Sequence, residues 1–212
     1  MKTPKEKNYY MPAEWYPHQC CWMQWPYENP NHDGYSAIPS WSHFDFEKGR
    51  SAWANVAKSI AEFEKVKMIV HPDNKKNAKN LLDDKVEIIE FKIDDCWARD
   101  SGAIFLLDNK NKLGAVDWEF NGWGKFKPFD SDNKIAKLMI ENSSATYFKN
   151  NMILEGGSIH VDGEGTLLTT EQCLLNKNRN PNLSKEEIEK NLKEYLGINK
   201  IIWLKNGTDE GT

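Results

Sequence analysis

Hydrophobic and polar positions along the chain follow two alternating patterns, one with the spacing of helices and one with that of strands. Between residues 46 and 64, apolar side chains recur every three or four positions, which predicts a helix. A second helix is predicted at 74–82, and short apolar runs predict strands at 20–25, 66–70 and 86–91. Because strands that alternate with helices are typical of α/β folds, we expect that fold class.

Two hairpins are predicted in the second half of the chain. The first joins apolar runs at 103–107 and 113–120 through a polar turn. The second joins runs at 158–161 and 166–169 through Asp162-Gly163, a dipeptide that favours a two-residue type I′ turn.

Each hairpin is followed by a predicted helix and a further strand. These elements are a helix at 133–140 with a strand at 145–148, and a helix at 184–196 with a strand at 200–204. Ser184 and Glu187 form a capping box that starts the last helix. Residues 27–44 are rich in Asn, Asp, Gly, Pro and Ser and are predicted to form a long loop.

Composition narrows the class of protein. The chain has 212 residues, 39% of them hydrophobic, which is enough for a packed core in one large domain or two small ones. Its net charge of −4 argues against a nucleic-acid partner, and no apolar run is long enough to span a membrane. The N-terminus lacks the apolar segment of a signal peptide, so a cytoplasmic location is expected. The four cysteines show no zinc-ligand spacing, so neither a metal ion nor a disulfide framework is expected.

The two hairpins share one sequence register, which indicates an internal repeat. Asp100 lies four residues before Ile104, and Glu155 lies four residues before Ile159, each with a glycine at the second position after the acid. A repeat of this kind implies units that stack or are arranged around an axis. The two acids would then occupy equivalent places.

The segment 94–100 combines several chemically active side chains. It contains the carboxylates Asp94, Asp95 and Asp100, together with a thiol, Trp97 and Arg99. Arginine is rare here, with three among the 28 basic residues, and its planar group is suited to paired hydrogen bonds. A solvated turn with local ion pairs would explain the segment. A carboxylate beside an aromatic ring could also bind a cationic ligand.

Glu155 is the second candidate acid, set between apolar residues and paired glycines. Two carboxylates facing one cavity could act as acid and base, bind a divalent metal or hold a guanidinium group. An acidic metal-binding module built from Asp94, Asp95, Asp100 and Glu155 is therefore one alternative. Cys96 is a poor candidate nucleophile because the neighbouring carboxylates would raise its pKa.

Several segments resemble the agmatine deiminases, a family grouped with the bacterial peptidyl-arginine deiminases. The matching segments are MPAEWYPH, DDCWARDSGA, FNGWG, LEGGSIHVDGEGTLLTTEQCLLNKNRNP and IIWLKNG. The resemblance covers nearly the whole chain and implies a pentein-type α/β propeller, normally of five ββαβ units around a central site. Residues 1–212 would form the N-terminal portion of that domain, with about three of the five units.

The resemblance also implies a chemistry. A cysteine thiolate attacks the guanidinium carbon, ammonia leaves, and water hydrolyses the resulting thiouronium, so that agmatine gives N-carbamoylputrescine on a route to polyamines. Asp100 and Glu155 would hold the guanidinium, Trp97 would line the pocket, and Arg99, Asp94 and Asp95 would support the site. No cofactor or metal is implied, the partner would be the small guanidinium substrate, and a homo-oligomer is expected.

The chain departs from the family at its C-terminal end. The family's catalytic His-x-Asp and its cysteine would follow the segment matching residues 208–212, so the resemblance assigns no catalytic residue within this chain. The alternatives are an agmatine deiminase-like enzyme completed elsewhere, a non-catalytic remnant that binds guanidinium compounds, and a peptidyl-arginine deiminase. We expect the 212-residue chain alone to lack deiminase activity.

Overall fold

The computed structural model describes residues 2–33 and 45–207 of the chain. Most of the loop predicted at 27–44 therefore lies outside the described residues. The chain divides into two compact units, the smaller formed by Pro17–Ala98 and Lys125–Asp132 and the larger by Met1–Tyr16, Arg99–Gly124 and Asn133–Thr212.

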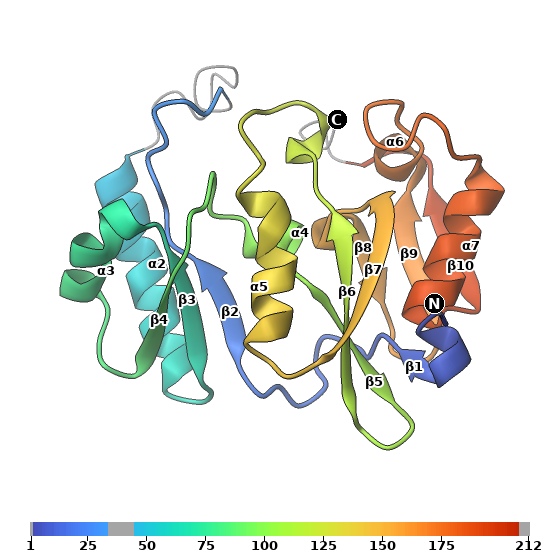
Figure 1. The fold of residues 1–212 in the computed structure, drawn as a ribbon, viewed down its shortest axis with the longest axis horizontal. Coiled ribbons are helices and arrows are strands. Elements are labelled where there is room, and N and C mark those ends of the chain that lie inside the picture. The colour runs from blue at the N-terminus through green and yellow to red at the C-terminus, as the bar shows by residue number, and fades with distance from the viewer. Residues whose placement is uncertain (1, 34–44, 208–212) are drawn as a thin grey trace. The chain divides into compact units, whose positions relative to one another are not determined.

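The smaller unit contains a parallel sheet of three strands covered by helices. Its strands, in sheet order, are β2 (Cys21–Gln24), β3 (Val66–Val70) and β4 (Val86–Glu90). The helices α2 (Phe46–Ala61) and α3 (Lys75–Leu81) connect them, with a short 3-10 turn, η2 (Pro72–Asn74), before α3 (Figure 1). Ala54 and Ala57 of α2 pack with Ala78 of α3 on the buried side chains of the strands.

The first sheet of the larger unit has four strands. Their order in the sheet is β1 (Tyr9–Tyr10), β5 (Ile104–Asp108), β6 (Leu113–Glu119) and β7 (Thr146–Ile153). Helix α5 (Ile135–Glu141) lies over this sheet (Figure 1). Short turns precede or follow these elements: η1 (Lys5–Lys7), α4 (Ala98–Ser101), η3 (Gly122–Gly124) and η4 (Asp132–Lys134).

The second sheet of the larger unit has three strands, in the order β10 (Lys200–Leu204), β9 (Thr166–Thr170) and β8 (Ile159–Val161). Its other elements are η5 (Gly156–Ser158), α6 (Glu171–Leu174) and α7 (Lys185–Leu196). Helix α7 places Ile188, Leu192 and Leu196 at four-residue spacing on one face, and all three are buried in the core of this unit.

The two sheets of the larger unit share one pairing pattern, which confirms the repeat predicted from the sequence. In the first, β5 pairs antiparallel with β6, and β6 pairs parallel with β7. In the second, β8 pairs antiparallel with β9, and β9 pairs parallel with β10. Each parallel connection contains a helix, as a crossover requires. The α/β class is therefore correct, and Asp100 and Glu155 each precede the first strand of a repeat.

Several element boundaries differ from those predicted. The first helix ends at Ala61 instead of residue 64, and the strand predicted at 145–148 continues to Ile153. The prediction of a two-residue type I′ turn at Asp162-Gly163 is wrong, because β8 and β9 are joined by the four residues 162–165. The Asp162 carboxylate accepts hydrogen bonds from the backbone N–H groups of Glu164 and Thr166, and this stabilises the longer loop.

The capping of the last helix is as predicted. The Ser184 side chain accepts a hydrogen bond from the Glu187 N–H, and the Glu187 carboxylate accepts one from the Ser184 N–H. Gly197 follows in the left-handed conformation with φ of 69°. Among residues 2–33 and 45–207, no helix combines the length and apolar character needed to cross a membrane.

Candidate functional site

Asp100 lies in α4, the single helical turn that leads into β5. Its Oδ1 atom accepts a hydrogen bond of 3.0 Å from the backbone N–H of Gly157, which belongs to the other repeat. The neighbouring Arg99 donates from Nε to the carbonyl oxygen of Gly156 at 3.0 Å. Two consecutive residues of α4 therefore fix the turn that follows Glu155.

Glu155 is buried, with 2% of its surface exposed, at the residue that precedes η5. Its Oε1 atom accepts a hydrogen bond of 2.6 Å from Nε of Arg179, and both side chains are almost fully buried. The Asn178 side chain accepts a further hydrogen bond from Arg179 at 2.8 Å. The buried carboxylate is thus matched by a buried cation, as the cost of burying an isolated charge requires.

Glycine is needed at two positions of this turn because the two repeats approach closely. A Cβ atom on Gly156 would clash with the backbone carbonyl of Arg99, and one on Gly157 would clash with the Asp100 carboxylate. The paired glycines singled out in the sequence therefore allow the backbone that follows Glu155 to reach α4.

The two acids interact electrostatically. The pKa of Asp100 is raised to about 6, first because the carboxyl is largely buried and second because the charge of Glu155 lies close to it. The Gly157 N–H, the Trp123 side chain and the charge of Arg99 act in the opposite direction. An additional cation placed between the two acids would relieve their repulsion and favour the ionised form of Asp100.

Trp123 and Cys173 are two contacts of this site that the sequence interpretation missed. Trp123 has no role in the sequence interpretation, yet its side chain forms a hydrogen bond with Asp100. Its ring also packs edge to face on Phe120, with the ring centroids 5.0 Å apart. Cys173 is partly buried, and its Sγ atom lies 3.8 Å from Oε2 of Glu155. Burial and the Glu155 charge raise the pKa of the Cys173 thiol to about 11.

Arg179 is the main residue that the sequence interpretation left without a role. The rarity of arginine could have indicated it, since it is one of only three arginines among the 28 basic residues. No local pattern connects Arg179 to Glu155, which lies 24 positions away in the chain. That contact exists because the segment after α6 returns to the start of the same repeat.

The remaining predicted site residues occupy different surroundings. Trp97 belongs to the smaller unit and is 37% exposed. Its ring packs edge to face on Trp53, with the ring centroids 6.2 Å apart. Arg99 forms an ion pair with Glu14 in addition to its bond to Gly156. The expectations that Trp97 lines the substrate pocket and that Arg99 supports the site stay predictions.

Asp94 and Asp95 are buried in a network within the smaller unit. The Asp132 carboxylate accepts hydrogen bonds from the backbone N–H groups of both residues, each at 2.9 Å. Asp94 in turn accepts bonds from the N–H groups of Ser131 and Asp132. Burial, together with the charges of Asp95 and Asp94, raises the pKa of Asp132 well above its usual value. These contacts give Asp94 and Asp95 the role of joining two loops of the unit.

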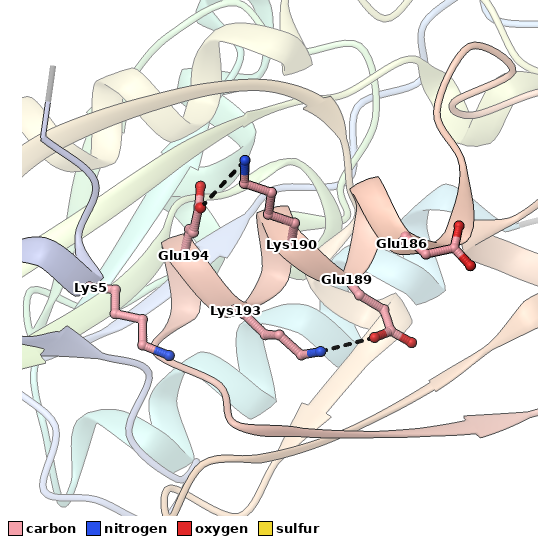
Figure 2. Close-up of a pocket in the computed structure, with 6 residues that line it drawn as sticks. All are labelled: Lys5, Glu186, Glu189, Lys190, Lys193 and Glu194. Atoms are coloured by element: carbon pink, nitrogen blue, oxygen red, sulfur yellow. Dashed lines mark hydrogen bonds and ion pairs between the residues drawn. The ribbon is translucent and has the colours of Figure 1, made fainter.

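The alternative of an acidic metal-binding module receives no support from this arrangement. Asp94 and Asp95 belong to the smaller unit, and Asp100 and Glu155 to the larger one. Among the described residues of each unit, neither pair joins a third ligand side chain in a group that could hold an ion. A shallow hollow elsewhere, shown in Figure 2, lies along α7 and next to Lys5. Its lining consists of charged side chains, two pairs of which bond to one another along the helix, so it has the character of a solvated helix face.

Comparison with known proteins assigns the chain to a family. The profile of the Porphyromonas-type peptidyl-arginine deiminases matches residues 10–212. The chain belongs to this family. It is 48% identical over 207 residues to a protein of Legionella pneumophila and 44% identical over 212 residues to the agmatine deiminase of Pseudomonas aeruginosa. The recognition made from the sequence motifs is therefore confirmed.

Solved structures of the family share the fold. The agmatine deiminase of Enterococcus faecalis is 36% identical and superposes with a TM-score of 0.89, covering 100% of this chain. The present chain covers 57% of that protein, and 57% and 55% of the Legionella and Pseudomonas proteins. It thus has the α/β fold of the deiminases and spans somewhat more than half of their length.

Proposed function

We propose that this chain forms the guanidinium-binding part of an agmatine deiminase-like hydrolase. The reaction would cleave a C–N bond of agmatine, giving N-carbamoylputrescine and ammonia through a cysteine-bound thiouronium. Asp100 and Glu155 would hold the guanidinium group of the substrate. The observation that carries the proposal is that Asp100 bonds to the N–H of Gly157, two residues after Glu155, so that two acids 55 positions apart in the chain meet at one turn. The charge of Glu155 accordingly raises the pKa of Asp100.

The surroundings of the acids support binding of a planar cation. Burial strengthens the interaction of a carboxylate with a cation because little water is present to screen it. Hydrogen bonds from Gly157 and Arg179 fix one oxygen of each acid. The orientation of the carboxylates is therefore set before the ligand arrives, which reduces the entropic cost of binding.

Similarity to agmatine deiminases favours agmatine as the substrate. A substrate-bound agmatine deiminase of Campylobacter jejuni is 32% identical and superposes on 94% of this chain with a TM-score of 0.79. Peptidyl arginine is the alternative that the family name itself supplies. The two differ in the groups beyond the guanidinium, so a binding comparison of agmatine with a short arginine peptide distinguishes them.

Substitution of the buried acid tests the proposal. Glu155→Gln should weaken binding of agmatine by at least about tenfold, because a charge-assisted bond to a buried carboxylate contributes about 1.5–3 kcal/mol. Glu164→Gln is the matched control, since Glu164 lies in the β8–β9 loop of the same repeat and is not part of the proposed site. Isothermal titration calorimetry of both variants measures the difference. Equal affinities of the two variants would refute the assignment of Glu155.

An ammonia assay separates binding from catalysis. We expect no ammonia from agmatine with this chain alone, because burial raises the pKa of every cysteine in it and leaves the thiols protonated. Binding without turnover would fit either a guanidinium-binding remnant or one part of a larger enzyme. Turnover that Cys96→Ser or Cys173→Ser abolishes would place the nucleophile in this chain and contradict the expectation.

We also propose a cytoplasmic location and assembly into a homo-oligomer, without nucleic-acid or membrane partners. The four cysteines are free thiols, the state that a reducing compartment maintains. The net charge of −4 disfavours binding to polyanions.

A further inference from the structure

Three side chains of metal-ligating type meet in the smaller unit, in a different unit from the acids described above. They are His18, Cys21 and Glu64, and one donor atom of each lies within 4.8 Å of the other two. Cys21 Sγ is 3.0 Å from Oε1 of Glu64, and Nδ1 of His18 is 3.5 Å from the same oxygen. All three side chains reach the surface, so an ion could enter from solvent.

These separations suit tetrahedral coordination. Zinc binds sulfur at about 2.3 Å and nitrogen or oxygen at about 2.0–2.2 Å, so ligand atoms around one ion lie roughly 3.3–3.8 Å apart. The separation of His18 Nδ1 from Glu64 Oε1 already has this value, and Cys21 Sγ must withdraw from that oxygen by only about half an ångström to match it. The third pair, His18 Nδ1 and Cys21 Sγ, lies within 4.8 Å, so the three ligand atoms are already gathered within reach of one ion.

The backbone supports the same geometry. Cys21 is the first residue of β2, and its N–H donates to the carbonyl of Lys65 at 2.8 Å, next to Glu64. The Glu64 N–H donates to the carbonyl of Ile60 in α2. Two of the three ligands are thus held by the sheet and by the end of a helix, which gives the cluster a defined shape without a metal.

We propose that His18, Cys21 and Glu64 form a binding site for Zn²⁺ with water as the fourth ligand. The imidazole nitrogen and the sulfur are ligands that zinc prefers, and the thiolate selects against the hard ions Mg²⁺ and Ca²⁺. Sequence spacing does not reveal the site, because Glu64 is 43 positions from Cys21 and no paired-cysteine motif is present.

Binding requires that the thiol lose its proton. The Cys21 thiol donates a hydrogen bond to Oε1 of Glu64 at 3.0 Å, so the sulfur carries a proton that has to leave before zinc binds. Coordination breaks the S–H bond, releases the proton to solvent and forms the Zn–S bond, with no change in oxidation state. About one proton should therefore be released per zinc bound.

Titration of the untagged chain with Zn²⁺ against a chromophoric chelator tests the site. We expect one ion per chain, and Cys21→Ser, Glu64→Gln and His18→Asn should each weaken binding by at least about tenfold, since even outer-sphere partners of zinc contribute about 10- to 100-fold. Cys20→Ser and Glu62→Gln are the matched controls, because each changes the same residue type close by outside the cluster. Both controls should bind zinc as the parent chain does.

Two further measurements use the parent chain and therefore do not depend on whether a variant folds. Substitution of Co²⁺ for Zn²⁺ should produce a near-ultraviolet thiolate-to-metal absorption band, and Zn²⁺ should protect Cys21 but not Cys20 from alkylation, read by mass spectrometry. Absence of binding, absence of the thiolate band, or equal protection of the two cysteines would overturn the proposal.

Discussion

At the scale of single residues, the most informative contact is the one between Glu155 and Arg179. A guanidinium of the protein itself already occupies Oε1 of the acid that the family resemblance assigns to the substrate guanidinium. The second oxygen, Oε2, is the atom that faces Cys173. Arg179 therefore supplies a counter-charge and fixes the carboxylate plane, and in our proposal the Oε2 side of Glu155 receives the ligand.

The raised pKa of Asp100 leads to a prediction about pH. A cation is held by the ionised carboxylate, and that form is lost as the pH falls through about 6. We expect the affinity for agmatine to be constant above pH 7 and to fall by about tenfold per unit below pH 6, because one proton must then leave before binding. Calorimetry between pH 5 and pH 8 measures this profile.

Asp100→Asn should bind agmatine more weakly and remove the decrease below pH 6, whereas Glu164→Gln should retain it. A parent profile that is flat from pH 5 to pH 8 would show that Asp100 does not control binding. Agmatine itself keeps its guanidinium charged over this range, so the ligand does not contribute a transition there.

At the scale of elements, the candidate site depends on the close contact between α4 and η5. Both are single turns that lead into the first strand of a repeat, and hydrogen bonds from Arg99 and Gly157 join them. No side chain other than hydrogen fits at Gly157, because the space for a Cβ atom is taken by the Asp100 carboxylate. Glycine at position 157 therefore allows the Asp100 carboxylate to approach the turn that follows Glu155.

Gly157→Ala should displace Asp100 and weaken agmatine binding, with a loss of stability of about 1–3 kcal/mol, which is typical of overpacking. Gly207→Ala is the control, since an added Cβ there meets only ordinary contacts at 3.7 Å or more. Calorimetric binding and urea denaturation of the two variants give both quantities. If Gly157→Ala binds agmatine as tightly as Gly207→Ala, the contact between α4 and η5 does not position the site.

At the scale of the whole molecule, one face of the β8–β10 sheet carries three exposed apolar side chains among polar ones. Leu168, Ile202 and Leu204 are 36–47% exposed there, and His160 lies on the same face of the strands. Exposed apolar side chains on neighbouring strands are typical of surfaces that bind another protein surface. This face is a candidate interface for the proposed homo-oligomer.

We expect the purified chain to self-associate, with a mass in light scattering above that of a monomer and rising with concentration. Ile202→Lys with Leu204→Lys should shift the population towards the monomer, because two charges would have to lose their hydration in the interface. Val56→Lys and Phe63→Lys, at exposed apolar positions in the smaller unit, serve as the control pair. A parent chain that remains monomeric at high concentration would contradict this prediction.

Much of the fold could be predicted from the sequence because its signals are local. Strand 66–70, strand 200–204 and the capped start of α7 depend on neighbouring residues and agree with the structure. The repeat was visible because Asp100 and Glu155 hold the same place before Ile104 and Ile159. The motifs around these acids also identified the family.

Tertiary structure decided the contacts between residues that are distant in the chain. The sequence does not specify that Arg179 reaches Glu155, that the Gly157 N–H binds Asp100, or that Glu64 lies beside Cys21. Nor does it specify that Asp94 and Asp95 bond to the 131–132 segment within the smaller unit instead of standing on a solvated turn. Periodicity and capping act over a few residues, whereas the partner and pKa of a buried charge depend on which segments the packed core brings together.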